Sequence, residues 1–388
     1  MTHRKIIIIG AGIGGLTSAI ALAQRGFEVS VHEQSSALGE LGAGLTVPAT
    51  AMRVFNALGL WEQVRDITVR STGMTFVHYQ TGAVLHGQAD WEWTRKPDTV
   101  DQGGQTHRAM LHSLLLKALR NVAPNALVLG HRLKAVVQDP DRVRAEFENG
   151  EVVDGDLLVG CDGWKSVAYR SIFGADNSAK FTNVVAIRCM IPRELAEPYI
   201  SRGRSMKYVG PGLGFSRYGV KQGSLINCIA LARASSWTEE GWCHPCSRNE
   251  FLELYKNFHP DVLGLIANAP EGDIFKWALY DRDPLAVWTK GRATLLGDAA
   301  HPMLPYMAQG ATVAIEDAYV LARALSNHPD YTEALGRYEA ARIPRTSAQM
   351  RASRDQAAAL NQDDPNQYAA RRADFEGIAA YNAVTAPL

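Results

Sequence analysis

Three glycines near the start of the chain, Gly10, Gly12 and Gly15, have the spacing of a loop that binds a phosphate group. The first permits a tight turn, the second lets the backbone approach a pyrophosphate, and the third lets a helix pack closely on a strand. Glu33 follows about 20 residues later, where a carboxylate accepts hydrogen bonds from ribose hydroxyls and repels a 2′-phosphate. These residues predict a dinucleotide site for FAD or NAD, and they do not distinguish the two.

A second group of residues, near position 300, suits a cofactor whose charge changes. Asp298 directly follows the apolar run 294–297, and ligands of open α/β sheets bind at the carboxyl ends of strands. Gln309, Gly310 and Ala311 open a helical pattern, so free N–H groups and a positive dipole end are expected there. Such a helix start stabilises the negative charge that a flavin gains on reduction. Together with the glycine loop, these two features favour FAD over NAD.

The hydrophobic pattern shows which elements must position these residues. The β-branched run Ile6–Ile9 predicts a strand buried on both faces of a parallel sheet, and the spacing from Leu16 to Gly26 predicts the helix that follows. Residues 29–31 predict the next strand. Residues 180–232 alternate in hydrophobicity and include a Gly-rich hairpin at 208–223, which predicts an antiparallel sheet on the substrate side.

The cofactor residues are spread along the chain, so the domain that holds them must be discontinuous. We predict an α/β protein with a Rossmann-like FAD-binding domain, an inserted antiparallel-sheet substrate domain and C-terminal helices. The FAD-binding domain is assigned to residues 1–70, 105–175 and 276–330. The substrate-side domain is assigned to residues 71–104 and 176–275. Residues 331–388 are expected to form a helical cover with a mobile end, and Trp91 and Trp93 to be packing residues.

Several motifs resemble those of the single-component FAD-dependent aromatic hydroxylases, the group A flavoprotein monooxygenases. They are the glycine loop, the segment Gly160–Ser166 with its Asp-Gly pair, and the segment Gly297–Pro302. The segment Trp277–Leu285 is similar to the branch that contains the salicylate, 3-hydroxybenzoate and 6-hydroxynicotinate monooxygenases. The resemblance extends over about residues 5–345.

This resemblance implies roles for further cofactor residues. Asp298 would accept a hydrogen bond from the ribityl chain of FAD, and Arg108 would reach the pyrophosphate or ribityl region. Asp162 would contribute to both FAD and nicotinamide binding. Gly44 belongs to the segment after the glycine loop, and the backbone at Leu133 would lie against adenine.

The resemblance also implies the reaction. NADH or NADPH would reduce FAD, and O2 would form a flavin C4a-hydroperoxide that hydroxylates a small hydroxylated aromatic or pyridine carboxylate. Tyr218 and Tyr306 would bind a ring oxygen, with Pro305 beside them, and Arg188 would anchor a carboxylate.

The sequence departs from its relatives in two places. Gly214 stands where several relatives have His, and Thr50 stands where Asn is common. The identity of a catalytic base is therefore open. Arg217 is expected to be a surface residue, and His301 is expected to brace the turn before Pro302.

Composition excludes several other classes. Lys and Arg together number 40, as do Asp and Glu, so no long-range field favours nucleic acid or an anionic membrane. No apolar run approaches the roughly 20 residues that a membrane helix needs. Cys243 and Cys246 lack a second pair, so no metal is expected. An odd count of five cysteines and no signal peptide indicate a cytoplasmic protein. We expect a monomer or homodimer.

Two alternatives remain open at this point. The glycine loop and Glu33 would suffice for an NAD-dependent dehydrogenase, which leaves Asp298 and Gln309 unexplained. A flavin-binding protein that does not hydroxylate would fit the two departures at Gly214 and Thr50.

Overall fold

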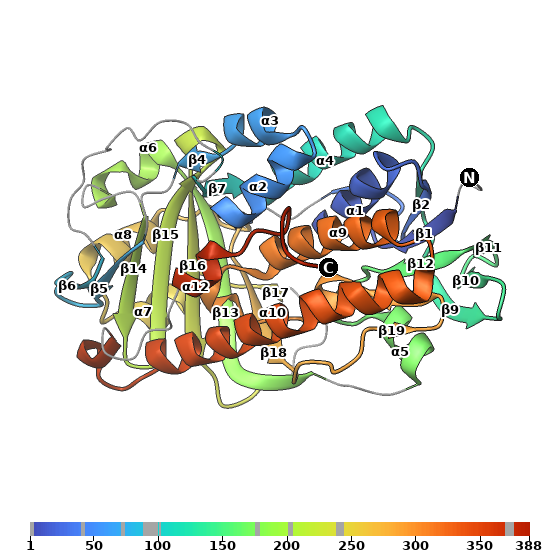
Figure 1. Cartoon of the computed structure of the whole chain (residues 1–388). Helices are drawn as coiled ribbons and strands as arrows, with labels where there is room; N and C mark the ends of the chain where they lie inside the picture. Colours follow the sequence, from blue (N-terminus) through green and yellow to red (C-terminus); the bar gives the residue numbers. More distant parts are fainter. Residues whose placement is uncertain are drawn as a thin grey trace.

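The computed structural model describes residues 4–39, 43–70, 74–87, 100, 102–174, 179–200, 205–237, 244–368 and 376–388. Trp91, Trp93 and Cys243 lie outside these residues. Two large sheets stand at opposite ends of the molecule, and a long helix runs along both (Figure 1).

The first sheet has six strands in the order β19-β20-β12-β1-β2-β8. Its strands are parallel except for the β19–β20 pair. The strand bounds are β1 Lys5–Ile9, β2 Glu28–Glu33, β8 Leu127–Leu129, β12 Leu157–Gly160, β19 Thr289–Lys290 and β20 Ala293–Leu295. Ile6–Ile8 are fully buried, as expected for a strand with helices on both faces. This sheet is the Rossmann-like core of the predicted FAD-binding domain.

Helices and two small sheets surround this core. The helices are α1 Ile13–Ala23, α2 Ala49–Ala57, α3 Trp61–Asp66, α4 Arg108–Val122, α5 Val167–Phe173 and α9 Gly310–Asn327. One small sheet contains β9 Leu133–Gln138, β10 Val143–Phe147 and β11 Val152–Gly155, and the other contains β3 Gly44–Val47, β4 Val69–Arg70 and β7 Gly104–His107.

The second large sheet has eight strands in the order β17-β18-β13-β16-β15-β14-β5-β6. Their bounds are β5 Thr75–His78, β6 Val84–His86, β13 Lys180–Pro192, β14 Ser205–Gly210, β15 Leu213–Val220, β16 Leu225–Arg233, β17 His244–Pro245 and β18 Phe275–Asp281. All its pairs are antiparallel except β14–β5. β18, which lies at the start of the third segment assigned to the FAD-binding domain, pairs with β13 in this sheet.

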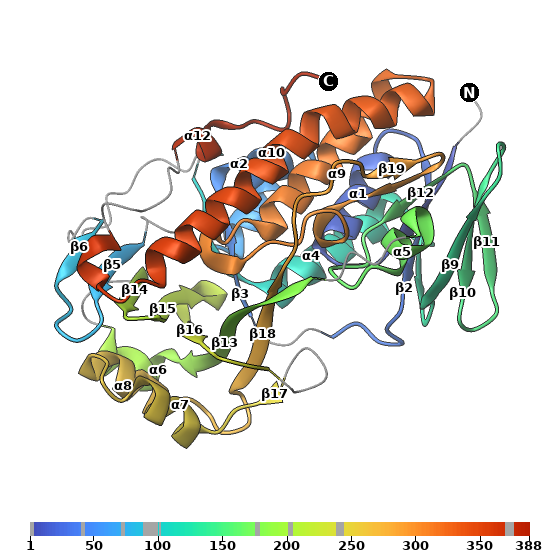
Figure 2. The same ribbon diagram turned by 90° about the horizontal axis from the view of Figure 1, so that it is seen from below.

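The two faces of this second sheet are covered differently. α7 Arg248–Tyr255 and α8 Pro260–Ala267 pack on the outer face, against Ile187 and Phe215 (Figure 2). α6 Arg193–Ala196 and the single turns η1 Glu197–Tyr199 and η2 Lys221–Gly223 connect its strands. The inner face is turned toward the FAD-binding domain, and this orientation creates the space for a site.

The C-terminal region joins the two sheets. α10 Tyr331–Leu360 runs the length of the molecule in both views, and is followed by η5 Pro365–Gln367 and α12 Glu376–Ala380. The expectation of a mobile C-terminus is wrong, because residues 381–388 pack on the core. Ala383 is fully buried, and Arg323 Nη1 donates hydrogen bonds of 2.9 Å to the carbonyls of Ala383 and Ala386.

Candidate active site

A cavity of about 600 Å³ lies between the Rossmann-like core and the inner face of the second sheet. The backbone around the glycine loop explains why its glycines are needed. Gly10 has φ of 101°, and a Cβ there would lie 2.5 Å from the Cys161 carbonyl oxygen. A Cβ at Gly15 would lie 2.0 Å from the Gly10 oxygen. At Gly12 a Cβ would meet nothing within 4 Å, so this glycine faces open space where a ligand can approach the backbone.

Two helix N-termini open into this cavity. α1 begins after Gly12 and α9 after Gln309, and neither has a side-chain cap or an acidic residue in its first turn. Gly12, Ile13, Gly310 and Ala311 line the cavity. Their first-turn N–H groups lack intrahelical partners, so the two helix starts can bind a pyrophosphate and an electron-rich ring edge. This donor set fits FAD.

The carboxylate of Glu33 supports the glycine loop from the end of β2. One of its oxygens accepts a 2.9 Å hydrogen bond from the N–H of Ala11, and the other accepts one from Ser35. The N–H of His131 donates to the Glu33 carbonyl, which brings Leu133 at the start of β9 to the same end of the sheet. Gly10, Gly15, Glu33, Leu133, Asp162 and Gln309 are not among the described residues that line the cavity.

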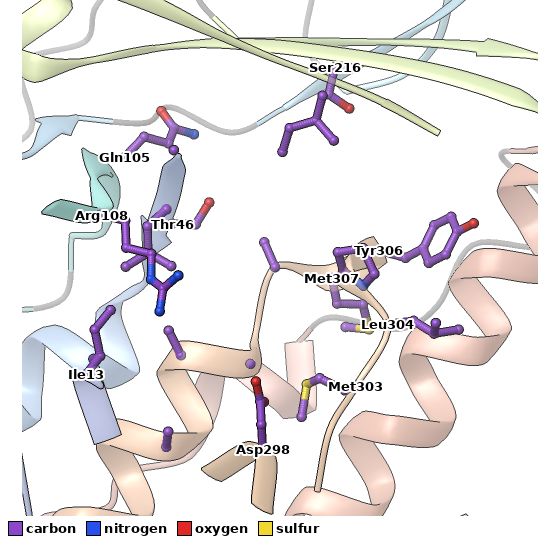
Figure 3. A pocket seen from close by; sticks show the side chains of 18 of the residues that line it. Ile13, Thr46, Gln105, Arg108, Ser216, Asp298, Met303, Leu304, Tyr306 and Met307 are labelled. Atoms are coloured by element: carbon purple, nitrogen blue, oxygen red, sulfur yellow. The ribbon is translucent and has the colours of Figure 1, made fainter. Parts of the chain in front are cut away.

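Asp298 and Arg108 both line the cavity (Figure 3). Asp298 lies in the turn η3 Gly297–Ala299, directly after β20. Burial raises the pKa of its carboxyl, while the charges of His301, Arg108 and Arg282 oppose that shift. The carboxylate is exposed to the cavity that it lines, and such a group fits a ligand that carries hydroxyl groups. The oxygen Oε1 of Gln309 is buried without a protein partner in the described chain.

Asp162 lies at the start of α5 and is held there by hydrogen bonds. Its carboxylate accepts hydrogen bonds from the Ser166 hydroxyl at 2.5 Å and from the N–H groups of Val167 and Ala168 at 2.7 and 2.9 Å. Burial raises the pKa of this carboxyl, and these hydrogen bonds lower it. Asp162 thus holds the start of α5, and its neighbour Gly163 lines the cavity.

The opposite wall of the cavity is a single cross-strand row on the second sheet. Strand register places these residues side by side in the order Phe76, Lys207, Ser216, Ile229 and Arg188. Side chains of directly paired residues point to the same face of a sheet. All five line the cavity.

Arg188 belongs to this row, and Tyr218 lines the cavity from the same face of the sheet. Arg188 stacks on Trp277, with 4.9 Å from its guanidinium carbon to the ring centroid, and its Nε is buried without a partner among the described residues. Burial lowers the pKa of Arg188. Burial raises the pKa of Tyr218 to about 12, so this hydroxyl keeps its proton at neutral pH.

Pro305 and Tyr306 lie in the turn η4 Pro305–Met307, below the sheet in Figure 3. Both line the cavity, but the Tyr306 hydroxyl is directed toward α10 and accepts a 3.0 Å hydrogen bond from the side-chain amide of Asn361. The ring of Tyr306 therefore contributes the wall, and its hydroxyl is held outside the cavity.

Gly44 is where the two domains touch. Its N–H donates a 2.9 Å hydrogen bond to Asn227 Oδ1, and a Cβ would lie 2.6 Å from Asn227 and 2.7 Å from Tyr218. Only glycine lets β3 pass so close to the second sheet, so Gly44 sets the distance between the cofactor side and the substrate side.

Lys207 and Ser216 were not predicted, although the alternation of β14 and β15 contained the signal. Met206 and Tyr208 are apolar neighbours that face α7 and α8, so the intervening Lys207 must face inward. The expectation for Arg217 is wrong. Arg217 is fully buried on the outer face, where it donates to the Met206 sulfur and interacts with Tyr208.

His301 braces its turn as expected, because its Nε2 lies 2.5 Å from Asp317 Oδ2. In the described chain no group of three or more His, Cys, Asp or Glu residues could hold a metal ion. Nor do the described helices include one with the length and apolar character to cross a bilayer.

Comparison with known proteins agrees with this geometry. The model of the FAD binding domain family matches residues 3–190 and 273–353. The 3-hydroxybenzoate 6-hydroxylase 1 of Aquipseudomonas alcaligenes is 35% identical over 89% of this chain and 86% of that protein. The 6-hydroxynicotinate 3-monooxygenase of Bordetella bronchiseptica is 31% identical over 93% of this chain and 94% of that protein.

Solved structures share the fold. A salicylate hydroxylase in complex with substrate superposes with a TM-score of 0.82 at 21% identity, covering 99% of this chain and 98% of that one. Klebsiella pneumoniae HpxO, solved with FAD and uric acid, has a TM-score of 0.83 at 22% identity and covers 100% and 98%. The chain therefore belongs to the FAD binding domain family and is an FAD-dependent aromatic-ring monooxygenase.

Proposed function

We propose that this enzyme hydroxylates a small hydroxylated aromatic or pyridine carboxylate, with O2 and NADH or NADPH as co-substrates. The observation that carries the proposal is the composition of the cavity. One wall has two uncapped helix N-termini and the carboxylate of Asp298, and the other is a sheet face with Arg188 and Tyr218. The first wall suits a flavin dinucleotide, and the second suits a small anion with a ring.

The first wall would hold the cofactor. The N-terminus of α1, at Gly12, would bind the pyrophosphate together with Arg108, whose guanidinium suits phosphate oxygens. Glu33 would accept hydrogen bonds from ribose, and Asp298 from the ribityl chain. The start of α9 at Gly310 and Ala311 would stabilise negative charge on the ring system. When bound, FAD supplies the electron transfer and the oxygen activation that no side chain can supply.

The second wall would orient the substrate. The fork of Arg188 suits a carboxylate, and its buried Nε gains a partner when such a ligand binds. Tyr218 would donate a hydrogen bond to the ring oxygen, since it remains protonated at neutral pH. Pro305 and the ring of Tyr306 would keep water from the reacting carbon.

The relatives also support this substrate class. Their names record hydroxybenzoate and hydroxynicotinate as substrates, and this chain covers most of each of them. We expect a cytoplasmic monomer or homodimer.

The test uses the purified protein with its cofactor. We expect it to be yellow, to release FAD on denaturation, and to oxidise NADH or NADPH faster when a hydroxybenzoate or hydroxypyridine carboxylate is added. Mass spectrometry should show a product with one added oxygen atom, derived from labelled O2. Cofactor-loaded protein that oxidises NAD(P)H equally with and without every member of this panel would instead be a flavin-binding protein that does not hydroxylate.

A further inference from the structure

We infer that Lys207 is the catalytic base of this site, and that it takes the proton from the ring hydroxyl of the substrate. The inference rests on the proposed function, and it names the catalytic base whose identity the sequence leaves open. It is carried by the position of Lys207, by its surroundings, and by the other groups in the cavity.

The position of Lys207 is unusual for a lysine. It lies in the middle of β14, is 8% exposed, and lines the cavity next to Ser216 and Phe76 in the cross-strand row. Its ammonium nitrogen lies 5.6 Å from the centroid of the Tyr306 ring. Lysines are almost never this buried unless they are paired. Among the described residues, no ion pair joins Lys207 to a carboxylate, so no buried partner compensates its charge.

Gly214 lies beside this lysine on the neighbouring strand. A Cβ at Gly214 would lie 3.6 Å from Lys207 Cε, an ordinary van der Waals contact, and φ at this position is not in the left-handed region. The lysine side chain from β14 thus passes over Gly214 of β15, and this position can accept a side chain.

The remaining titratable groups of the cavity are unsuited to the task. Burial lowers the pKa of Lys207 to about 8, which is close to the ideal for a base near neutral pH. Burial raises the pKa of Tyr218 to about 12, and also raises the pKa values of Cys161 and Tyr306. The other charged side chains that line the cavity are Arg188 of β13, Arg108 of α4 and Asp298 of η3. The strands on either side of β14 contribute Phe76 and Ser216, which carry no charge.

The proposed step conserves atoms and charge. The ring O–H bond breaks and an N–H bond forms on Lys207, which leaves a ring oxyanion paired with an ammonium. The oxyanion makes the ring more nucleophilic toward the oxygen that is transferred. The proton returns from Lys207 to the product oxygen before release.

The test compares the variant Lys207→Met with wild-type holoenzyme and with Lys180→Met, which removes an exposed lysine of β13. For the best substrate of the panel, we expect Lys207→Met to lower kcat by about 10²- to 10³-fold while KM changes less than fivefold. In wild type, kcat/KM should rise with pH through about 8, and this limb should be absent in Lys207→Met. Lys180→Met should behave as wild type.

A second variant restores a base from the neighbouring strand. Gly214→His combined with Lys207→Met should recover part of the rate, with the rising limb moved to about pH 6.5, the ordinary pKa of histidine. The ultraviolet spectrum of the bound hydroxybenzoate supplies a readout apart from turnover. Wild type should lower the pKa of its hydroxyl group, and Lys207→Met should not.

The outcomes separate the two proposals. A Lys207→Met variant that keeps kcat and the pH limb, or that raises only KM, overturns the role of Lys207 and leaves the proposed function intact. An FAD-loaded wild type that hydroxylates no member of the panel overturns the proposed function, and with it the role of Lys207.

Discussion

At the scale of single residues, two charged groups line the cavity, the exposed carboxylate of Asp298 and the buried ammonium of Lys207. Neither forms an ion pair among the described residues, and a fold keeps such groups at a cavity wall when a ligand uses them. Each of the two therefore leads to a prediction that a purely structural residue would not satisfy.

Asp298→Ala should weaken FAD binding by about 10- to 100-fold, because a hydrogen bond to a charged group contributes roughly 1.5–3 kcal/mol. Titration of apoprotein with FAD, followed by flavin fluorescence, measures this change. Tyr306→Phe is the control, because its hydroxyl bonds to Asn361 outside the cavity, and its FAD affinity should stay near that of wild type. Equal affinities in the two variants would contradict the role of Asp298.

Lys207→Met should stabilise the apoprotein at pH 7, by up to about 3 kcal/mol. The pKa of Lys207 is about 8 in the folded state against 10.5 when exposed, so the unfolded state binds more protons between these values. Below pH 8 the lysine is charged in both states and its burial is fully unfavourable. As pH rises from 8 to 10.5, Lys207 loses its proton in the folded wild type, so the free-energy cost of burying a charge disappears. The difference in stability between the variant and wild type should therefore vanish.

Urea unfolding of both apoproteins at pH 7 and pH 10.5 measures the difference. A variant that is less stable than wild type at pH 7 would show that Lys207 is a structural residue.

At the scale of elements, the unit formed by β1, the glycine loop and α1 contains glycines with two different roles. Gly15 is needed for packing, since a Cβ would lie 2.0 Å from the Gly10 oxygen, whereas Gly12 faces open space. The sequence motif names both glycines, but the structure shows that only one of them is free for a ligand.

We therefore expect Gly12→Ala and Gly15→Ala to fail in different ways. Gly15→Ala should lower the free energy of unfolding of the apoprotein by about 3 kcal/mol, as overpacking does. Gly12→Ala should unfold like wild type and lose FAD affinity, because the added methyl group occupies the space of the pyrophosphate. Thermal unfolding and FAD titration measure the two effects. Apoproteins that are equally stable would refute the distinction.

At the scale of the whole molecule, a buried charge cluster ties α10 to the core. Arg342 of α10 donates hydrogen bonds to Asp317 Oδ1 at 2.7 Å and to Glu316 Oε2 at 2.9 Å, and all three side chains are fully buried. Asp317 also pairs with His301 of the cofactor turn. Burial alone would raise the pKa of Asp317, but the charges of His301 and Arg342 hold it below its usual value. The contribution of the Asp317 carboxylate to stability is complete above its pKa in the unfolded state. It is lost as pH falls through the lower pKa that Asp317 has in the folded state.

Removing one partner from this cluster should be severe. Arg342→Met should cost about 3–5 kcal/mol of unfolding free energy, because it removes the fully buried cation between two buried carboxylates and leaves only Arg345 on Glu316 and His301 on Asp317. Arg337→Met on the same helix breaks an exposed pair with Glu333 and should cost less than about 1 kcal/mol. Chemical unfolding of both variants at pH 7 gives the comparison. Similar losses for the two would show that the cluster is not what holds α10.

Much of this enzyme could be predicted from local sequence. The glycine loop, the strand before it and the helix start at Gly310 depend on hydrogen-bond geometry and spacing within a few residues, which a sequence records directly. For the same reason Gly10, Gly12 and Asp298 could be named from their neighbours along the chain.

The rest depended on tertiary structure. Lys207 faces the cavity because of its position in β14, and Arg217 is buried because α7 and α8 cover the other face of the sheet. The Tyr306 hydroxyl accepts a hydrogen bond from Asn361, a residue far along the chain, and the sequence around Tyr306 does not indicate this partner. Strand pairing and helix docking bring together residues separated by hundreds of positions. They decide whether a given polar side chain meets solvent, a partner or a ligand, because that outcome depends on neighbours that local spacing does not specify.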